Sequence, residues 1–203
     1  MSAAAAEHPC DGERGSLLDE ADVLAERNPG HRVEIIGGVI TVSPLADFAH
    51  ARALTTAMLP FLMAGFDGTR ADVLQAVAMW LPSGPSDYAI PDLAIVDADF
   101  EEHHVERNCY DPGVFRLVLE VTSSNYQADL RNKVAAYAQA GIPVYVIVDR
   151  KHQRLHVLTD PDGTEYGHHR IHAPSEQITL PESIGTEVKL DVEELLKAAE
   201  RKA

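Results

Sequence analysis

Two apolar, strand-like segments of this chain each carry one carboxylate, and this pairing constrains the fold more than any other feature. Asp92 lies within residues 90–96 and Glu120 within residues 114–122, where Val, Leu and Ile otherwise dominate. Burying a lone carboxylate is costly even after its surroundings relax, so each acid needs a partner that offsets the cost. The simplest shared partner is a divalent cation. The sequence therefore predicts a sheet with a metal site inside it.

The other segments alternate between helical and strand patterns. Apolar spacing predicts helices at residues 17–27, 48–64 and 127–140 and a C-terminal helix capped by Asp191. Two β-branched runs around Gly37-Gly38 predict a hairpin. Further strands are expected at residues 72–81, 90–96, 114–122, 144–148, 154–158 and 165–171. This order predicts an α/β fold in which a mixed central sheet is flanked by helices, with an N-terminal helix and β-hairpin.

Length and composition fit a single domain. The chain has 203 residues, of which 45% are hydrophobic, enough for one sizeable core. We expect residues 1–15 to form a disordered tail, residues 16–197 to form the domain and residues 198–203 to be a frayed C-terminus. No window approaches the roughly 18 consecutive apolar residues of a membrane span, and no leader pattern is evident. We therefore expect a cytoplasmic protein with no membrane partner.

The charge of the chain limits the kinds of partner that it can take. The net charge is −15 with only 17 Lys and Arg residues. Coating nucleic acid by general electrostatics needs clustered basic residues, so this balance argues against it. A local positive groove, or a dimer that concentrates one, stays open. The absence of a Gly-rich phosphate loop, a Ser nucleophile elbow, a CxxC pair and an HExxH motif disfavours those enzyme classes.

A lysine on the helix after the Glu120 strand completes the candidate cluster. At about 100° per residue, Leu130, Val134 and Tyr137 share one apolar stripe, and Lys133 lies at its edge. The helix follows the strand through a short loop, so it should pack on the same sheet with the Lys133 amine near the carboxylates. Two acids and a lysine around one cation are typical of phosphodiester hydrolysis. Mg²⁺ takes oxygen ligands and activates a bound water, while the lysine stabilises charge on the phosphoryl oxygens.

The segments that carry these residues resemble the PD-(D/E)XK nuclease superfamily and, more narrowly, the Uma-two family of endonucleases. The resemblance spans roughly residues 17 to 196, and the matching stretches are residues 33–44, His50, residues 90–96, 119–123 and 129–149. It implies a restriction-endonuclease-like fold and a Mg²⁺-dependent endonuclease, with Mn²⁺ able to substitute. It also implies DNA as the substrate and a homodimer as the working form.

The resemblance further implies roles for particular residues. It assigns catalytic or metal-binding roles to Asp92, Glu120, Lys133, the carbonyl group of Val121 and, as an additional ligand, Glu34. The superfamily pattern has a lysine two residues after the glutamate, where this chain has Thr122. Lys133 is the implied substitute for that missing lysine.

Each candidate also has an ordinary structural interpretation. Asp92 follows a proline and is compatible with a turn, and Glu120 is compatible with a buried ion pair to Arg116 or Lys133. Lys133 is compatible with a lysine that extends past the apolar stripe to water. Glu34 alternates with apolar neighbours, so the period of a strand alone predicts that it faces solvent. Two other functions therefore stay open. One is an inactive nuclease-fold module that binds nucleic acid or a protein partner, and the other is a structural domain without a nucleic acid partner.

Overall fold

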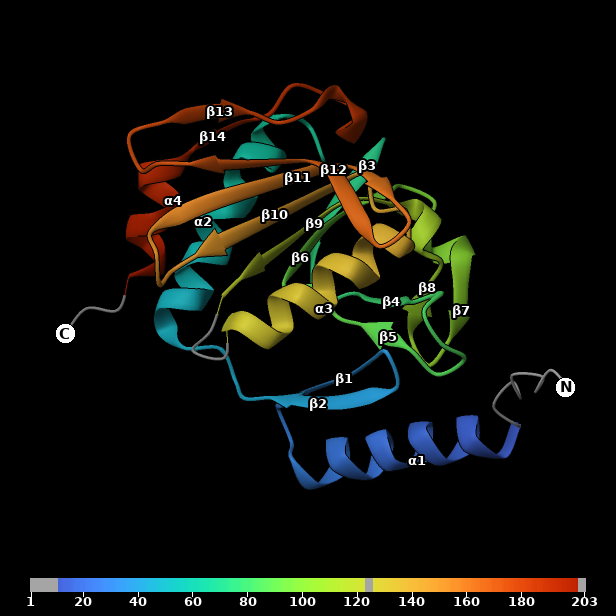
Figure 1. Cartoon of the computed structure of the whole chain (residues 1–203). Coiled ribbons are helices and arrows are strands. Elements are labelled where there is room, and N and C mark those ends of the chain that lie inside the picture. Colours follow the sequence, from blue (N-terminus) through green and yellow to red (C-terminus); the bar gives the residue numbers. More distant parts are fainter. Residues whose placement is uncertain (1–10, 123–125, 201–203) are drawn as a thin grey trace, which may run out of the picture.

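A mixed six-stranded sheet forms the centre of the protein (Figure 1). The computed structural model describes the backbone of residues 11–122 and 126–200 and the side chains of residues 17–122 and 131–200. The strand order is β12-β11-β10-β9-β6-β3. Within this sheet, as far as the chain is described, only β9 and β10 pair in parallel. The strands are β3 (Ala71–Gln75), β6 (Leu93–Asp97), β9 (Phe115–Val121), β10 (Val144–Asp149), β11 (Arg154–Asp162) and β12 (Glu165–His172).

A second six-stranded sheet, in the order β2-β1-β5-β4-β8-β7, lies between the central sheet and α1 (Figure 1). Its first two strands are the expected Gly-Gly hairpin. Helix α1 (Asp11–Arg27) covers this hairpin, and Leu18 and Ala21 of the helix pack against Val33 and Ile35 of β1. The strands are β1 (Arg32–Ile36), β2 (Val39–Ser43), β4 (Ala78–Trp80), β5 (Tyr88–Ala89), β7 (His104–Glu106) and β8 (Cys109–Tyr110).

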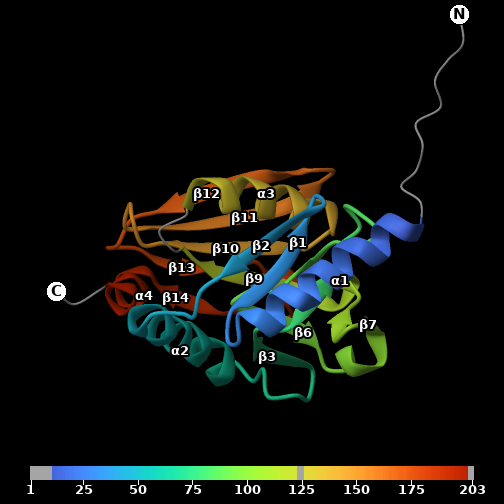
Figure 2. The ribbon, with the colours of Figure 1, turned by 90° about the horizontal axis from the view of Figure 1, so that it is seen from below.

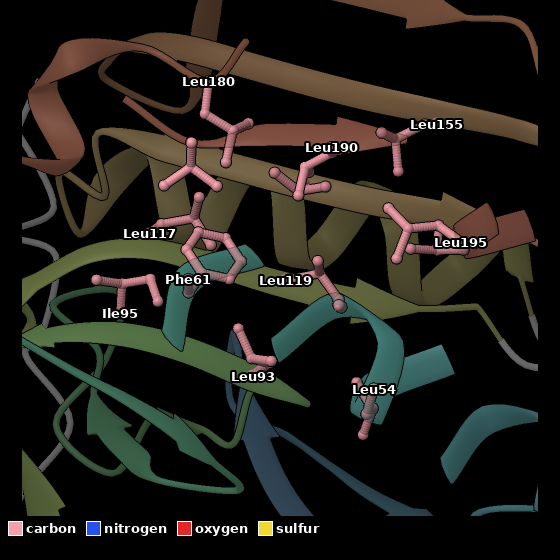
Figure 3. Packing of buried hydrophobic residues seen from close by; sticks show 14 of the residues in the cluster. Leu54, Phe61, Leu93, Ile95, Leu117, Leu119, Leu155, Leu180, Leu190 and Leu195 are labelled. Carbon is pink, nitrogen blue, oxygen red and sulfur yellow. The ribbon is translucent and has the colours of Figure 1, made fainter. Parts of the chain in front are cut away.

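Helices cover both faces of the central sheet (Figure 2). Helix α3 (Tyr126–Gln139) lies on one face, and α2 (Phe48–Met63) and α4 (Val192–Ala199) lie on the other. The short pair β13 (Gln177–Thr179) and β14 (Lys189–Asp191) adds to the α2 and α4 side, where leucines from sheet and helices interlock (Figure 3). Three 3₁₀ turns complete the elements: η1 (Phe100–His103), η2 (Pro112–Val114) and η3 (Glu182–Ile184). The α/β fold with a mixed, helix-flanked sheet is thus confirmed.

Strand alternation decides which side chains of β9 face α3. Leu117 and Leu119 belong to the core beneath α2 and α4, whereas Val118 belongs to the core beneath α3. Because successive strand residues point to opposite faces, Glu120 shares the α3 face with Val118. The short connection between β9 and α3 brings the helix back over this face.

Two strands that the sequence predicted as continuous are broken at neighbouring points. The predicted strand at 72–81 divides at Ala76, whose φ of 55° lies in the left-handed region, into β3 of the central sheet and β4 of the second sheet. Residues 90–92 of the predicted strand at 90–96 belong to no strand: they connect β5 of the second sheet to β6, which begins only at Leu93, and Pro91 among them has no N–H to donate to a ladder. The chain passes from one sheet to the other near Ala76 and again at residues 90–92. These two crossing points lie side by side, because Ala76 N donates to Asp92 O at 3.4 Å. Asp92 therefore lies at a crossing point, just outside the strand in which it was expected.

The ends of the chain differ from the expected boundaries. Helix α1 already begins at Asp11, within the expected disordered tail, and residues 1–10 lie outside the described residues. At the other end Ala198 and Ala199 are buried rather than frayed. Arg52 Nε donates to Ala198 O at 2.7 Å and Arg150 Nε donates to Ala199 O at 2.8 Å, which holds the last turn of α4. The single-domain organisation stays a prediction.

None of the helices in the described part of the chain is long and apolar enough to cross a membrane. The cytoplasmic location stays a prediction.

Candidate active site

Asp92 and Glu120 lie opposite one another across the β6–β9 pair. Leu93 pairs with Leu119 in this antiparallel ladder, and continuing the register by one position brings Asp92 opposite Glu120. Residues that are directly opposite in an antiparallel pair point to the same face. Both acids accordingly line one cleft of about 900 Å³. The register of β6 and β9 thus brings the two acids to the same cleft, as the sequence predicted.

Asp92 is buried and accepts hydrogen bonds on both oxygens. Arg32 Nη1 donates to Oδ1 at 2.7 Å, and the backbone N–H of Val121 donates to Oδ2 at 2.8 Å. Nε2 of His50, at the first turn of α2, lies 3.3 Å from Oδ2. Burial alone would raise the pKa of Asp92, but the His50 contact and the Arg32 charge hold it well below its ordinary value. Asp92 is therefore an ionised carboxylate.

Glu120 and Glu34 are joined by the amine of Lys133. The Nζ atom donates to Glu120 Oε1 at 2.8 Å and lies 3.0 Å from Glu34 Oε1. Burial alone would lower the pKa of Lys133, but the charges of Glu120 and Glu34 raise it above its ordinary value, which keeps the amine protonated. Lys133 therefore extends inward to the acids, and the interpretation that it reaches past the apolar stripe to water is wrong.

The protonation of Glu120 is set by opposing effects. Burial raises its pKa to about 7, although the Lys133 ammonium acts in the other direction. The hydroxyl of Tyr137 also donates to Glu120 Oε1, at 2.8 Å, and fixes the orientation of the carboxylate. The apolar stripe of the helix predicted Tyr137 as a core residue whose hydroxyl reaches a polar neighbour or the site, and that neighbour in the structure is Glu120.

Glu34 faces the cleft instead of solvent. Only 2% of the residue is exposed, and Oε1 accepts a hydrogen bond from Ile90 N at 2.8 Å. Its neighbours Val33 and Ile35 point the other way, into the core beneath α1. The alternation along β1 is as predicted, but the face that carries Glu34 is covered by Lys133 of α3 and by Ile90, between β5 and β6. The solvent-facing interpretation of Glu34 is therefore wrong.

Arg32 is a member of the cluster that sequence reasoning missed. It lies two positions before Glu34 on β1, so both side chains project from the same face of the strand toward the acids. The Arg32 guanidinium reaches Asp92, and its Nε lies 3.7 Å from Glu34 Oε2. The Arg-x-Glu spacing in a strand was the signal that would have identified it.

Thr122 takes no direct part in the acid cluster. Its hydroxyl donates to Val148 O at 3.2 Å and accepts from Arg150 N at 3.0 Å, which ties the end of β9 to β10. Val121 contributes its N–H to Asp92, and the role expected for its carbonyl oxygen stays a prediction. Thr122, which stands where the superfamily pattern has a lysine, thus stabilises the sheet.

The donor set of the cluster suits a hard divalent cation. Glu34, Asp92 and Glu120 offer carboxylate oxygens, the ligands that Mg²⁺ prefers. As they stand, side chains of the described residues form no group of three or more His, Cys, Asp or Glu arranged to hold a metal. The three acids are instead paired with the cationic side chains of Arg32 and Lys133. The oxygen donors of these residues fit a divalent cation by their chemistry, while their present arrangement is that of buried ion pairs.

The fold and the site define an α/β protein of the nuclease type, with buried acids on neighbouring strands and a lysine from the following helix. The model of the family Uma2, described as "Putative restriction endonuclease", matches residues 18–193. The chain belongs to this family.

A solved structure shares the fold. It is described as a putative nuclease belonging to DUF820 from Anabaena variabilis ATCC 29413, and it superposes with a TM-score of 0.67 at 14% sequence identity. The match covers 90% of this chain and 98% of that one. No curated protein matches the chain.

Proposed function

We propose that the protein is a metal-dependent endonuclease that hydrolyses phosphodiester bonds in DNA. The observation that carries the proposal is the meeting of three side chains in one cleft: Asp92 from the residue before β6, Glu120 from β9 and Lys133 from α3. Membership of a family described as putative restriction endonucleases supports the same reaction and a nucleic acid substrate.

Asp92, Glu120, the Val121 carbonyl and Glu34 would hold the cation, which would be Mg²⁺ with Mn²⁺ as a substitute. Bound there, Mg²⁺ would lower the pKa of a coordinated water and polarise the phosphate. The proposal rests on the oxygen donors that the three acids supply and on their burial within one cleft.

Lys133 would act as a fixed positive charge and not as a general base. Its amine is held protonated between Glu120 and Glu34, so it has no lone pair with which to accept a proton. A fixed ammonium beside the reacting phosphate stabilises the negative charge that develops on the phosphoryl oxygens. Tyr137 would keep the Glu120 carboxylate in position through its hydroxyl hydrogen bond.

Cleavage of plasmid DNA with Mg²⁺ or Mn²⁺ tests the proposal. We expect Asp92→Asn and Glu120→Gln each to lower the cleavage rate by about a hundredfold or more, because each removes a charge that the transition state needs. Glu165→Gln, at an exposed position of β12, is the matched control and should cleave like the wild type. Thermal unfolding of each variant shows whether it is folded. A folded Asp92→Asn protein that cleaves at the wild-type rate would refute the proposal.

A second candidate function is a catalytically inactive nuclease-fold module that binds nucleic acid or a protein partner. The observation that favours it is the pairing of the acids with Arg32 and Lys133, together with the net charge of −15. This candidate predicts a DNA gel shift, or capture of a protein partner, without cleavage at any Mg²⁺ or Mn²⁺ concentration.

We also propose that the protein acts as a homodimer. Cutting both strands of a duplex requires two sites, and one chain supplies a single acid cluster among its described residues. Light scattering of the purified protein, with and without DNA, measures the mass. A monomer under both conditions would contradict this part of the proposal without affecting the chemistry of the site.

A further inference from the structure

Arg32 holds the Asp92 side of the cluster with an incomplete set of hydrogen bonds. Its Nη1 atom donates to both Asp92 Oδ1 and Ile90 O, each at 2.7 Å. Its Nε atom is buried yet has no hydrogen-bond partner, and the Oε2 atom of Glu34 is 3.7 Å away. A buried donor without a partner is costly. The hydrogen-bond geometry of Arg32 is therefore poor for a permanent structural ion pair.

Two other arginines near the cleft are bound in a different way. Arg52 donates from Nε and Nη2 to three carbonyl oxygens at the end of α4. Arg150 donates to Ala199 O and to the N-cap residue of α2, Asp47. Both guanidinium groups thus hold helix ends in place. Arg32 instead binds a carboxylate that belongs to the candidate cation site.

Arg32 also has a route out of the cluster. Its side chain is 25% exposed whereas that of Asp92 is 4% exposed, so the guanidinium enters from the open side of the cleft. The arginine side chain has several rotatable bonds and can withdraw toward water while β1 stays in place. Asp92 cannot follow it, because the N–H of Val121 holds the other carboxylate oxygen.

The charges favour an exchange of Arg32 for a divalent cation. A divalent cation favours the ionised form of its carboxylate ligands, Glu120 included, and the three acids of the cluster then exceed the charge of Arg32 and Lys133 by one unit. Replacing the single charge of Arg32 by a divalent cation makes the cluster neutral. In a buried site such a balance matters more than it would in water.

We propose that Arg32 is a built-in competitor for the divalent cation: its guanidinium occupies the Asp92 side of the cation site and leaves it when a cation is bound. The inference rests on the function proposed above and adds a regulatory step to it. The released guanidinium stays tethered at the cleft, where its planar fork matches a phosphate group. Cation binding and phosphate binding would then strengthen each other, since coupling between two ligands is reciprocal.

Calorimetric titration with Mn²⁺ of the full chain tests the inference. We expect Arg32→Gln to bind Mn²⁺ about tenfold more tightly than the wild type, because the cation no longer has to break a charge-assisted hydrogen bond. Arg170→Gln, at an exposed position of β12, removes the same charge elsewhere and should leave the affinity unchanged. Wild-type binding that Arg32→Gln does not tighten overturns the inference and leaves the proposed function standing. Absence of Mn²⁺ binding in both proteins overturns the inference together with the metal-dependent function.

A second measurement uses the wild type, so it does not depend on how Arg32→Gln folds. In an NMR titration with Mg²⁺, the Nε resonance of Arg32 should shift and exchange with solvent more rapidly, while that of Arg52 should not change. An Arg32 resonance that is unaffected at saturating Mg²⁺ overturns the inference.

Discussion

Lys133 forms buried ion pairs with two carboxylates, those of Glu34 and Glu120. It is itself buried, and its amine lies within 3.0 Å of oxygens from Glu34 and Glu120. Glu34 comes from the hairpin, Glu120 from the central sheet and Lys133 from α3. The ammonium group therefore joins three elements as well as serving the proposed chemistry.

Replacing Lys133 tests this structural role. We expect Lys133→Met to lower the free energy of unfolding by about 3 kcal/mol, because removing one partner of a buried ion pair leaves the other charges uncompensated. Lys189→Met is the matched control: its exposed amine pairs with Glu187 at 3.1 Å, and such surface pairs contribute about 0–1 kcal/mol. Urea unfolding of both variants gives the comparison. Equal stability of the two variants would contradict the role assigned to Lys133.

At this scale the sequence identified part of the cluster. Asp92 and Glu120 stood out because acids are rare in apolar strands, and Lys133 because a helix after a strand packs on the same sheet. Arg32 was missed because its only signal was the Arg-x-Glu spacing on β1, and Tyr137 stood out little because a tyrosine on an apolar stripe is ordinary. Their contacts with the acids depend on where the hairpin and α3 lie in the folded protein.

Among the elements, the β1–β2 hairpin has the most direct effect on the site, because β1 carries both Arg32 and Glu34. Its turn residues Gly37 and Gly38 have φ angles of 60° and 72°, which glycine adopts without strain. The buried carboxylate of Asp87 accepts both of their N–H groups, at 2.6 and 3.0 Å, and the hydroxyl of Ser83 at 2.6 Å. Asp87 thereby fixes the hairpin to the β4–β5 connection.

Removing this anchor should loosen the hairpin. We expect Asp87→Ala to lower the free energy of unfolding by about 2 kcal/mol, since hydrogen bonds to a charged group are lost. The amides of Gly37 and Gly38 should also exchange faster with solvent. Ser83→Ala loses only one of the three bonds and should cause a smaller change. Hydrogen exchange measures both effects, and unchanged protection of the two glycine amides in Asp87→Ala would show that the hairpin does not depend on this anchor.

The order of helices and strands was largely predictable, and the breaks in the strands were not. The hairpin and the main helices follow from turn residues and apolar spacing. The division at Ala76 was missed because alanine rarely adopts a left-handed φ, so nothing in the local sequence indicates it. Pro91 was a visible signal for the second break, because proline interrupts a ladder. Together these breaks place Asp92 at the crossing between the sheets.

For the whole molecule, the cleft brings together segments that are far apart in the chain. The hairpin, the start of α2, the β10–β11 turn and the end of α4 all line the cleft, which includes Gly30, Asp47, Lys151 and Glu200. Both acidic and basic side chains line the cleft, so it is not a strongly positive groove. This agrees with the objection that the net charge of −15 raises to general electrostatic binding of DNA. A bound divalent cation would supply the positive charge that the cleft lacks.

The most direct test of the account is the anomalous scattering from a crystal of the wild type equilibrated with Mn²⁺. The account predicts a Mn²⁺ peak in the cleft at coordination distance, about 2.1 Å, from carboxylate oxygens of Asp92 and Glu120, with Arg32 turned away from Asp92. A cleft without a peak at saturating Mn²⁺, in which Arg32 still pairs with Asp92, would contradict it.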